Sequence, residues 1–370
     1  MPERLFQSFF MGGFECSSHR NSNGRRLDLI KSTQHDKFAE ADYSRMMDIG
    51  LETARDGIRW HLVEPEPYRY DFSSLESQIA AVKSTGIQVI WDYFHYGYPD
   101  DLDIFGGDFV ERFSLFSTAV TKYLQENLGG ELFVCPVNEI SFFAWIAGER
   151  GVFHPSVRRR GNELKAILIE ASLKSVDAIY SICPTARIIF TDPAIHVVPK
   201  DETAASKRAA EIYRRAQFKA FDKLASANEY DSANSLAYLD IIGLNYYFHN
   251  QWRHPGRRLI ANGHEKYRPF HQILIEFHNR FQRPIVIAET GIEDDARASW
   301  FKYVCDEAAI AISEGVEIQG ICLYPIVNHP GWADMRHCHN GLWDYPNKIG
   351  EREIYQPLAD EIVNQKLNFR

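Results

Sequence analysis

Eight short runs of apolar and β-branched residues recur along the chain and limit the folds that it can adopt. They lie near residues 5–14 and at 53–60, 87–94, 131–139, 186–192, 239–247, 284–289 and 318–326. Apolar residues occupy successive positions in many of these runs, as in strands that are buried on both faces of a sheet. The runs therefore predict a parallel sheet whose two faces are covered by helices.

Segments with helical periodicity separate most of these runs. Three of them place apolar residues on one face, namely Leu75, Ile79 and Val82; Phe109, Phe113, Phe116 and Val120; and Phe270, Ile273, Leu274, Phe277 and Phe281. Gly86 and Gly315 stand where two such segments would end, as is typical of helix C-termini. Eight strand–helix units in about 330 residues fit an α/β fold of the (β/α)8 barrel type. We expect a single domain, residues 1–370, with enlarged βα loops.

Charge and motif content exclude several other classes of protein. The chain has 41 basic and 50 acidic residues, a net charge of −9 that argues against nucleic acid or an anionic membrane as partner. GxGxxG after the first strand and GxxxxGK[ST] are both missing, so a nucleotide-binding fold loses its main support. No stretch approaches the ~18 apolar residues of a membrane helix, and the first residues do not resemble a signal peptide.

The cysteine pattern favours a reduced protein. The six cysteines form no CxxC pair and several lie within apolar runs, so we expect free thiols and a cytoplasmic location. The sequence His337-Cys338-His339 looks like a metal site, but neighbouring side chains point to different sides. We therefore expect no zinc site there. The candidate residues described below imply no other metal and no cofactor.

Two carboxylates stand out because each ends an apolar run. Glu139 and Glu289 would lie at the C-terminal ends of different strands, where barrels of this kind place their chemistry. One such carboxylate could be explained by a structural ion pair with an arginine such as Arg55. Two of them, surrounded by His, Asn, Tyr and Trp, indicate the carboxyl pair of glycoside hydrolysis. The polar and aromatic residues near the other strand ends are Arg55, Trp60, His95, Asn138, Asn245, Tyr246, Tyr247, Tyr324, His329 and Trp332.

The sequences around these residues resemble a known group. "VNEI" and "IAETG" resemble the acid/base and nucleophile motifs of clan A retaining glycosidases. The remaining motifs are most similar to glycoside hydrolase family 1, the β-glucosidase and β-galactosidase family; a sister family of the clan is the alternative. The likeness spans residues 9–345 and rests on "TARDGIRWHLVEP", "WDYFHYGYPDDL", "YLDIIGLNYY" and "NHPGWADMRHCHNGLWDY".

The resemblance implies a role for each matching residue. Glu289 would attack the anomeric carbon, and Glu139 would act first as acid and then as base. Asn245 and Tyr247 belong to the sixth-strand Asn-Tyr-Tyr motif, and Trp332 to the closing segment. Asn138 would form a hydrogen bond with the sugar 2-hydroxyl, and His95 would contact the sugar near its 3-hydroxyl. Tyr247 and Arg55 would depress the pKa of Glu289.

Three positions depart from the family pattern in the part that binds the glycone. Arg20 stands where the first-strand motif has Gln, Tyr324 replaces a Trp, and Gly331 replaces a Glu. We therefore expect Arg20 and Tyr324 to contact an altered sugar. Because a planar guanidinium binds carboxylates well, a uronic sugar is one alternative.

The function expected from these observations is that of a retaining exo-β-glycosidase with a carbohydrate substrate. The alternatives are a clan A endo-glycanase, a transglycosylase and a catalytically inactive sugar-binding barrel. The sequence leaves open the identity of the glycone, the aglycone and the oligomeric state.

Overall fold

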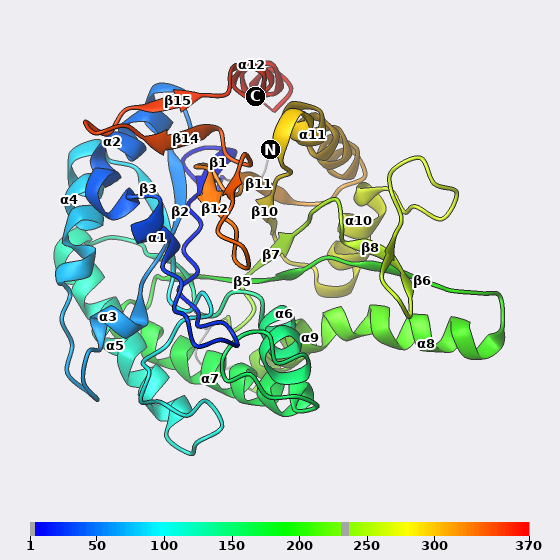
Figure 1. Ribbon diagram of the computed structural model, residues 1–370, viewed down its shortest axis with the longest axis horizontal. Helices are drawn as coiled ribbons and strands as arrows, with labels where there is room; N and C mark the ends of the chain where they lie inside the picture. The colour runs from blue at the N-terminus through cyan, green and yellow to red at the C-terminus, as the bar shows by residue number, and fades with distance from the viewer. Residues whose placement is uncertain (1–3, 231–236, 370) are drawn as a thin grey trace.

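The computed structural model describes residues 4–230 and 237–369. Eight parallel strands form a closed barrel in the order β1-β11-β10-β7-β5-β4-β3-β2 (Figure 1). The strands are β1 (Phe10–Gly13), β2 (Thr53–Gly57), β3 (Gln88–Asp92), β4 (Phe133–Cys135), β5 (Arg187–Pro193), β7 (Ile241–Asn245), β10 (Ile285–Thr290) and β11 (Ile318–Leu323). Each overlaps one of the eight predicted runs, so the predicted (β/α)8 barrel is confirmed.

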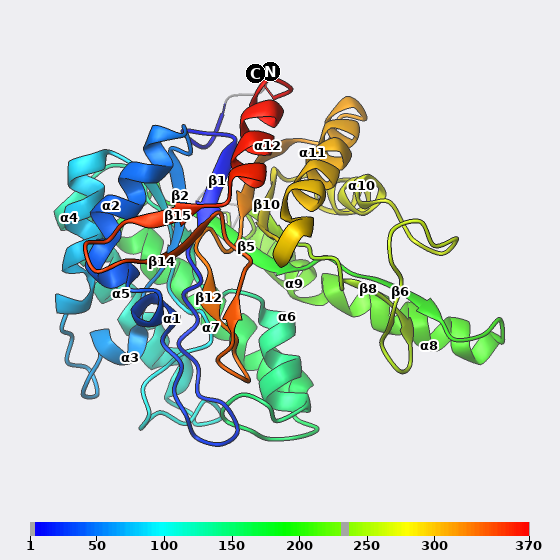
Figure 2. The ribbon, with the colours of Figure 1, turned by 45° about the horizontal axis from the view of Figure 1, so that its top comes forward.

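Helices surround the barrel on its outer side (Figures 1 and 2). The longer ones are α2 (His35–Asp48), α4 (Glu76–Thr85), α5 (Phe109–Leu128), α7 (Gly161–Ile182), α8 (Ala204–Arg215), α9 (Lys219–Tyr230), α10 (Phe270–Phe281), α11 (Arg297–Ser313) and α12 (Gln356–Lys366). The short ones are α1 (Leu29–Ser32), α3 (Trp60–Val63) and α6 (Ile140–Phe143). A π-helical turn at Ala144–Glu149 comes directly after α6. None of the helices in the described residues is both long and apolar enough to cross a membrane.

The predicted helix faces pack against the barrel. Phe109, Phe113, Phe116 and Val120 of α5 are all buried in one large core between sheet and helices. Gly86 ends α4 in the left-handed conformation at φ 73°, as its position after that helix predicted. A second, smaller core contains residues of seven of the eight barrel strands, among them Met11, Ile189 and Val286.

Two glycines at the barrel mouth make room for side chains of the candidate site. A Cβ on Gly13 would lie 2.2 Å from Cδ2 of Tyr324, and one on Gly57 would lie 2.3 Å from Cβ of Cys16. Real Cβ atoms do not approach other atoms so closely. The two glycines therefore allow Tyr324 and Cys16 to pack directly against β1 and β2.

The long loops carry three small sheets. The segment that we call the arm contains α8 and the sheet of β6 (His196–Pro199), β8 (Gln251–His254) and β9 (Arg258–Leu259), and it projects away from the barrel (Figure 2). After β11 the chain forms one hairpin from β12 (His329–Pro330) and β13 (His337–Cys338), and a second from β14 (Trp343–Pro346) and β15 (Arg352–Ile354). The sequence pattern did not predict these strands.

Candidate active site

A cavity of about 870 Å³ lies at the C-terminal ends of the barrel strands. Its wall includes the predicted residues Glu139, Glu289, His95, Tyr247, Tyr324, His329 and Trp332. Three other predicted residues, Arg55, Asn138 and Asn245, are almost completely buried and lie behind this wall. The structure thus brings the predicted site together, but in two layers.

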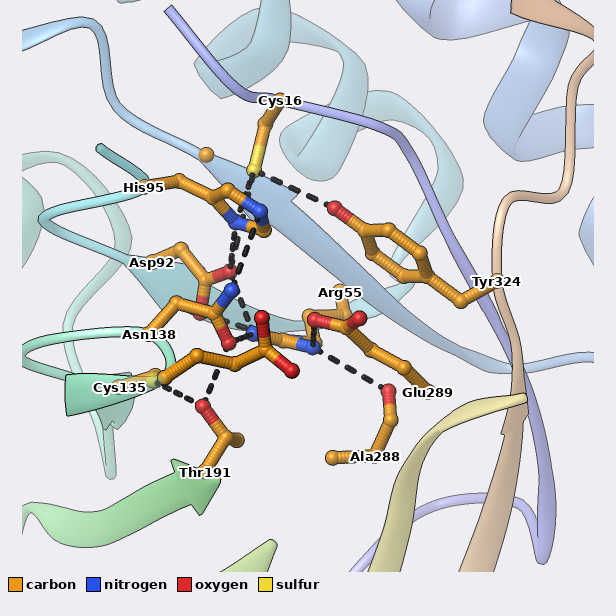
Figure 3. A network of polar contacts seen from close by, with 12 residues as sticks. Cys16, Arg55, Asp92, His95, Cys135, Asn138, Thr191, Ala288, Glu289 and Tyr324 are labelled. Carbon is orange, nitrogen blue, oxygen red and sulfur yellow. Dashed lines mark hydrogen bonds and ion pairs between the residues drawn. The ribbon is translucent and has the colours of Figure 1, made fainter. Parts of the chain in front are cut away.

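Glu289 is held by two hydrogen bonds. It is the second-last residue of β10 and pairs in register with Asn245 of β7. Arg55 of β2 donates from Nη1 to Oε1 of Glu289 at 2.6 Å, and the Tyr247 hydroxyl donates to Oε2 at 2.8 Å. Figure 3 shows the guanidinium between two carboxylates, because Arg55 also donates to Asp92 at 2.8 and 3.2 Å.

The ionisation of Glu289 differs from the expectation. We expected Arg55 and Tyr247 to depress its pKa, but burial raises the pKa above its ordinary value, and the charge of Arg55 only opposes that rise. The expectation was wrong because it left out the desolvation of a carboxylate that is 4% exposed. The ion pair nevertheless stabilises the charged form of Glu289 and of no other carboxylate that lines the cavity.

Glu139 has a different environment. It precedes α6 in the left-handed conformation (φ 49°), which its backbone N–H maintains by donating to the Thr191 carbonyl at 3.0 Å. The Tyr96 hydroxyl donates a hydrogen bond to its Oε2. Burial raises the pKa of Glu139 well above its ordinary value, and the nearby charge of Glu289 raises it further. Among the described residues, no Lys or Arg forms an ion pair with this carboxylate.

Asn138 lies behind the cavity wall and forms hydrogen bonds with partners of both glutamates, Arg55 and Tyr96. Its Oδ1 accepts hydrogen bonds from Nη2 of Arg55 at 2.7 Å and from the Thr191 hydroxyl at 2.6 Å. Its Nδ2 donates to the Tyr96 hydroxyl at 3.0 Å and to Nε2 of His95 at 3.1 Å. Both ends of the amide are therefore occupied by protein groups, and Asn138 does not face the cavity as the expected contact with a 2-hydroxyl requires. Asn245 is likewise fully buried, with Nδ2 3.5 Å from Oδ1 of Asn138.

His95 lines the cavity in a fixed orientation. Because Asn138 donates to Nε2, the proton of the neutral ring is on Nδ1, which lies 3.0 Å from Oδ2 of Asp92. Cys16 Sγ lies 3.1 Å from the same nitrogen and 3.7 Å from the Tyr324 hydroxyl (Figure 3). Burial opposes ionisation of Asp92, but Arg55 and His95 hold its pKa below the ordinary value.

Two predictions about site residues require correction. Arg20 is outside the cavity wall, where its guanidinium donates to Asp100 at 3.2 Å and to the Gly24 carbonyl at 3.2 Å. Its local hydrogen bonds turn the side chain toward the loop after β3, away from the sugar it was expected to bind. Trp60 is also no site residue, since its ring is fully buried against Phe116 and its Nε1 donates to Glu64 at 2.6 Å.

Sequence reasoning missed Glu15 and Tyr96, which lie in the wall beside the predicted residues. Glu15 follows β1, and the rule that identified the other two glutamates, a carboxylate after an apolar strand, also applies to it. Tyr96 follows His95 in the left-handed conformation (φ 69°), which turns its hydroxyl toward Glu139. A left-handed tyrosine has no local sequence signal, so Tyr96 could not have been found by pattern alone.

Several aromatic side chains line the cavity farther from the two glutamates. Phe142 and Trp145 come from the segment after β4, while Tyr213 and Trp252 come from the arm. The guanidinium of Arg257 lies 3.9 Å from the centroid of the Trp145 ring. Aromatic faces of this kind pack against the apolar faces of sugars and other flat ligands.

Two groups of described side chains have the donor types of a metal site. Cys16, Asp92 and His95 form one, but these three already bond to one another and to Arg55. His337, His339 and Asp344 form the other on the surface, where the two imidazoles stack 4.4 Å apart. The geometric reason for not expecting a site there was wrong for these two histidines, because their stacked imidazoles lie on the same side of the chain.

Comparisons with known proteins agree with this architecture. A family model described as beta-galactosidase (Glyco_hydro_42) matches residues 30–92. The rice (Oryza sativa subsp. japonica) protein "Beta-glucosidase-like SFR2, chloroplastic" is 23% identical over 331 residues, which are 80% of this chain and 50% of that protein. The chain thus spans about half the length of this curated relative.

Solved structures of similar fold cover the entire chain. A family 1 β-glucosidase from Thermotoga maritima has a TM-score of 0.80 at 15% identity, covering 100% of this chain and 98% of that chain. The structure of a family 1 β-glucosidase from Thermotoga maritima in complex with isofagomine lactam has a TM-score of 0.78 at 16% identity. This match covers 100% of this chain and 99% of that chain. The chain is a (β/α)8 barrel that resembles glycoside hydrolase family 1.

Proposed function

We propose that the chain is a retaining exo-β-glycosidase in which Glu289 is the nucleophile and Glu139 the acid/base. The observation that carries the proposal is the unequal environment of the two carboxyls. Arg55 and Tyr247 favour the charged form of Glu289, whereas burial without a cation favours the protonated form of Glu139. Two carboxyls whose pKa values are pushed apart in this way can supply a nucleophile and a proton donor at the same pH.

The first step forms a glycosyl ester. An oxygen of Glu289 attacks the anomeric carbon, the bond to the aglycone breaks, and its electron pair passes to the aglycone oxygen, which takes the proton from Glu139. The products are an α-glycosyl ester of Glu289 and a free alcohol. The neighbouring charge that raised the pKa of Glu139 is thereby neutralised, so the pKa of Glu139 falls for its next role.

The second step releases the sugar. Water attacks the anomeric carbon, gives a proton to Glu139, and returns the electron pair of the ester bond to Glu289. Two inversions yield a sugar of the original β-configuration. The aromatic half of the cavity, with Trp145 and Trp252, would hold the aglycone.

A nucleophile replacement tests this assignment. Glu289→Ala should lower kcat on an aryl β-glycoside by at least about 10⁴-fold, and added azide should restore turnover as an α-glycosyl azide. Glu139→Ala should instead yield a β-glycosyl azide, because azide then attacks the ester without needing a base. Glu314→Ala, an exposed glutamate beyond α11, is the matched control and should keep wild-type activity. Full activity in Glu289→Ala would overturn the assignment.

Transglycosylation is the second candidate, and the aromatic half of the cavity favours it. The rings that would hold a departing aglycone would equally hold an incoming acceptor alcohol. The ratio of transfer product to free sugar, measured at rising alcohol concentration, separates the two. Product sizes from a polysaccharide digest distinguish exo from endo action.

A further inference from the structure

Glu15 has one carboxylate oxygen without a protein partner. The residue follows β1, is 6% exposed and lines the cavity beside His95 and Tyr324. Its Oε1 accepts a hydrogen bond from the Ser17 backbone N–H at 2.9 Å and lies 3.9 Å from Nε2 of His95. In the described part of the chain, nothing donates to Oε2. This oxygen is not one of the fully buried atoms that lack a partner, so it is open to the cavity, where a ligand can supply the donor.

The charges around Glu15 are not balanced by the protein. Among the described residues, Arg55 is the permanent cation at this end of the site, and it is already shared between Asp92 and Glu289. His95 cannot donate to Glu15 in its neutral form, because its Nε2 accepts from Asn138. The barrel end of the cavity therefore carries more negative than positive charge.

The cations that do line the cavity belong to other elements. Lys165 of α7 donates to the Ser141 hydroxyl at 2.9 Å, and Arg257 of the β8–β9 connection stacks on Trp145. Neither comes from a barrel strand end or makes a hydrogen bond or ion pair with Glu15. At the strand ends of the described wall, a glycone at Glu289 therefore meets carboxylates but no Lys or Arg.

We propose that Glu15 selects the glycone by charge, so that the site favours a glycone with an ammonium group, accepts a neutral one and rejects a uronic acid. This inference rests on the proposed glycosidase function. An ammonium or hydroxyl group can donate to Oε2 of Glu15, whereas a uronic carboxylate offers no donor and is repelled. The uronic sugar that Arg20 suggested is disfavoured, since Arg20 is outside the cavity and an acidic residue is inside it.

Three substrates with one leaving group test the proposal. We would measure kcat/KM for the aryl β-glucoside, the 2-amino-2-deoxy-β-glucoside and the β-glucuronide near pH 6, where the amine is protonated. The wild type should prefer the amino sugar over the glucuronide by about 100-fold or more. In Glu15→Gln this ratio should fall at least about tenfold. Because each ratio is taken within one protein sample, partial loss of folded enzyme does not change it.

Glu163→Gln is the matched control. Glu163 is an exposed glutamate of α7 paired with Arg160, so the ratio should stay within about twofold of wild type. An unchanged ratio in Glu15→Gln, or a wild type that prefers the glucuronide, would overturn the proposal while leaving the glycosidase function intact. If none of the three is hydrolysed, the proposed function fails instead. In that case the role of Glu15 is tested by titrating the protein with the free sugars and following binding by NMR. Glucosamine should bind more tightly than glucuronate, and equal affinities would overturn the role of Glu15.

Discussion

Nη1 of Arg55 lies 2.6 Å from Oε1 of Glu289, and this contact distinguishes the two carboxylates of the site. The same guanidinium bonds to Asp92 and to Asn138, so one buried cation holds three acceptor side chains at once. Glu139 has neutral side-chain partners instead, namely Asn245 and the Tyr96 hydroxyl, to which Asn138 donates. Charge is therefore stabilised on one side of the cavity and a proton on the other.

Replacement of Arg55 by lysine should remove most of the activity. An ammonium is a point charge and cannot bridge Asp92, Glu289 and Asn138 as the planar guanidinium does. We expect kcat/KM to fall by about 100-fold or more, with the acidic limb of its pH profile at higher pH. Arg20→Lys, on the exposed pair with Asp100, should change kcat/KM by less than about twofold. Similar effects of both variants would contradict the account.

Removal of the Tyr96 hydroxyl should change the pH profile in a defined direction. The hydroxyl stabilises the charged form of Glu139, so its loss in Tyr96→Phe raises the pKa of Glu139. The alkaline limb of kcat/KM reports deprotonation of the acid and should therefore move to higher pH. Tyr98→Phe is the control, because the Tyr98 hydroxyl is buried without a partner among the described residues. A shift to lower pH in Tyr96→Phe would refute this role.

The hydrogen bond from Tyr247 to Glu289 makes the complementary prediction. Tyr247→Phe removes a donor to the charged carboxylate, so the pKa of Glu289 should rise and the acidic limb of kcat/KM should move to higher pH. The alkaline limb should stay in place, because Glu139 keeps Tyr96. A variant that moved only the alkaline limb would show that the two roles are reversed.

A buried histidine away from the cavity should make stability depend on pH. His35 is fully buried, which lowers its pKa, but Asp56 and Asp42 at 2.9 Å outweigh burial and raise the pKa to about 9. Since the folded pKa exceeds the unfolded value near 6.5, this stabilisation is complete below about pH 6.5 and is lost as pH rises toward 9. The loss should be on the order of 3 kcal/mol, measured by urea unfolding at pH 6 and pH 9.

The control for that experiment removes the titrating group. His35→Asn should be less stable than wild type at pH 6 and show a smaller loss of stability between pH 6 and 9. His339→Asn, at an exposed histidine, should keep the full wild-type loss. A wild type whose stability is the same at both values would contradict the raised pKa of His35.

The barrel could be predicted from the sequence because each strand is an apolar run that is recognisable by itself. The ends of those runs also identified Glu139 and Glu289. The arm could not be predicted, because β6 and β8 are four-residue strands that pair across more than fifty residues of chain. Strands of four residues are too short to show the alternation of apolar and polar residues from which a strand is predicted.

The division of the site into a cavity wall and a buried layer behind it could not be predicted from the sequence either. Asn138 and Tyr96 both follow barrel strands, yet the left-handed turns at Tyr96 and Glu139 place the tyrosine at the cavity and the asparagine behind it. Arg20 was selected by motif register alone, and its actual partner, Asp100, comes from a loop about eighty residues away. Desolvation, which reverses the expected pKa shift of Glu289, depends on packing that no motif records.

The most direct test of the central claim is to trap the sugar on Glu289. An activated 2-deoxy-2-fluoro β-glycoside slows the second step, so intact-protein mass spectrometry should show the addition of one glycosyl unit. Peptide mapping should place that unit on the segment that contains Glu289, and Glu289→Gln should remain unlabelled. A sugar attached to Glu139, or release of the anomeric leaving group without any covalent adduct, would contradict the account.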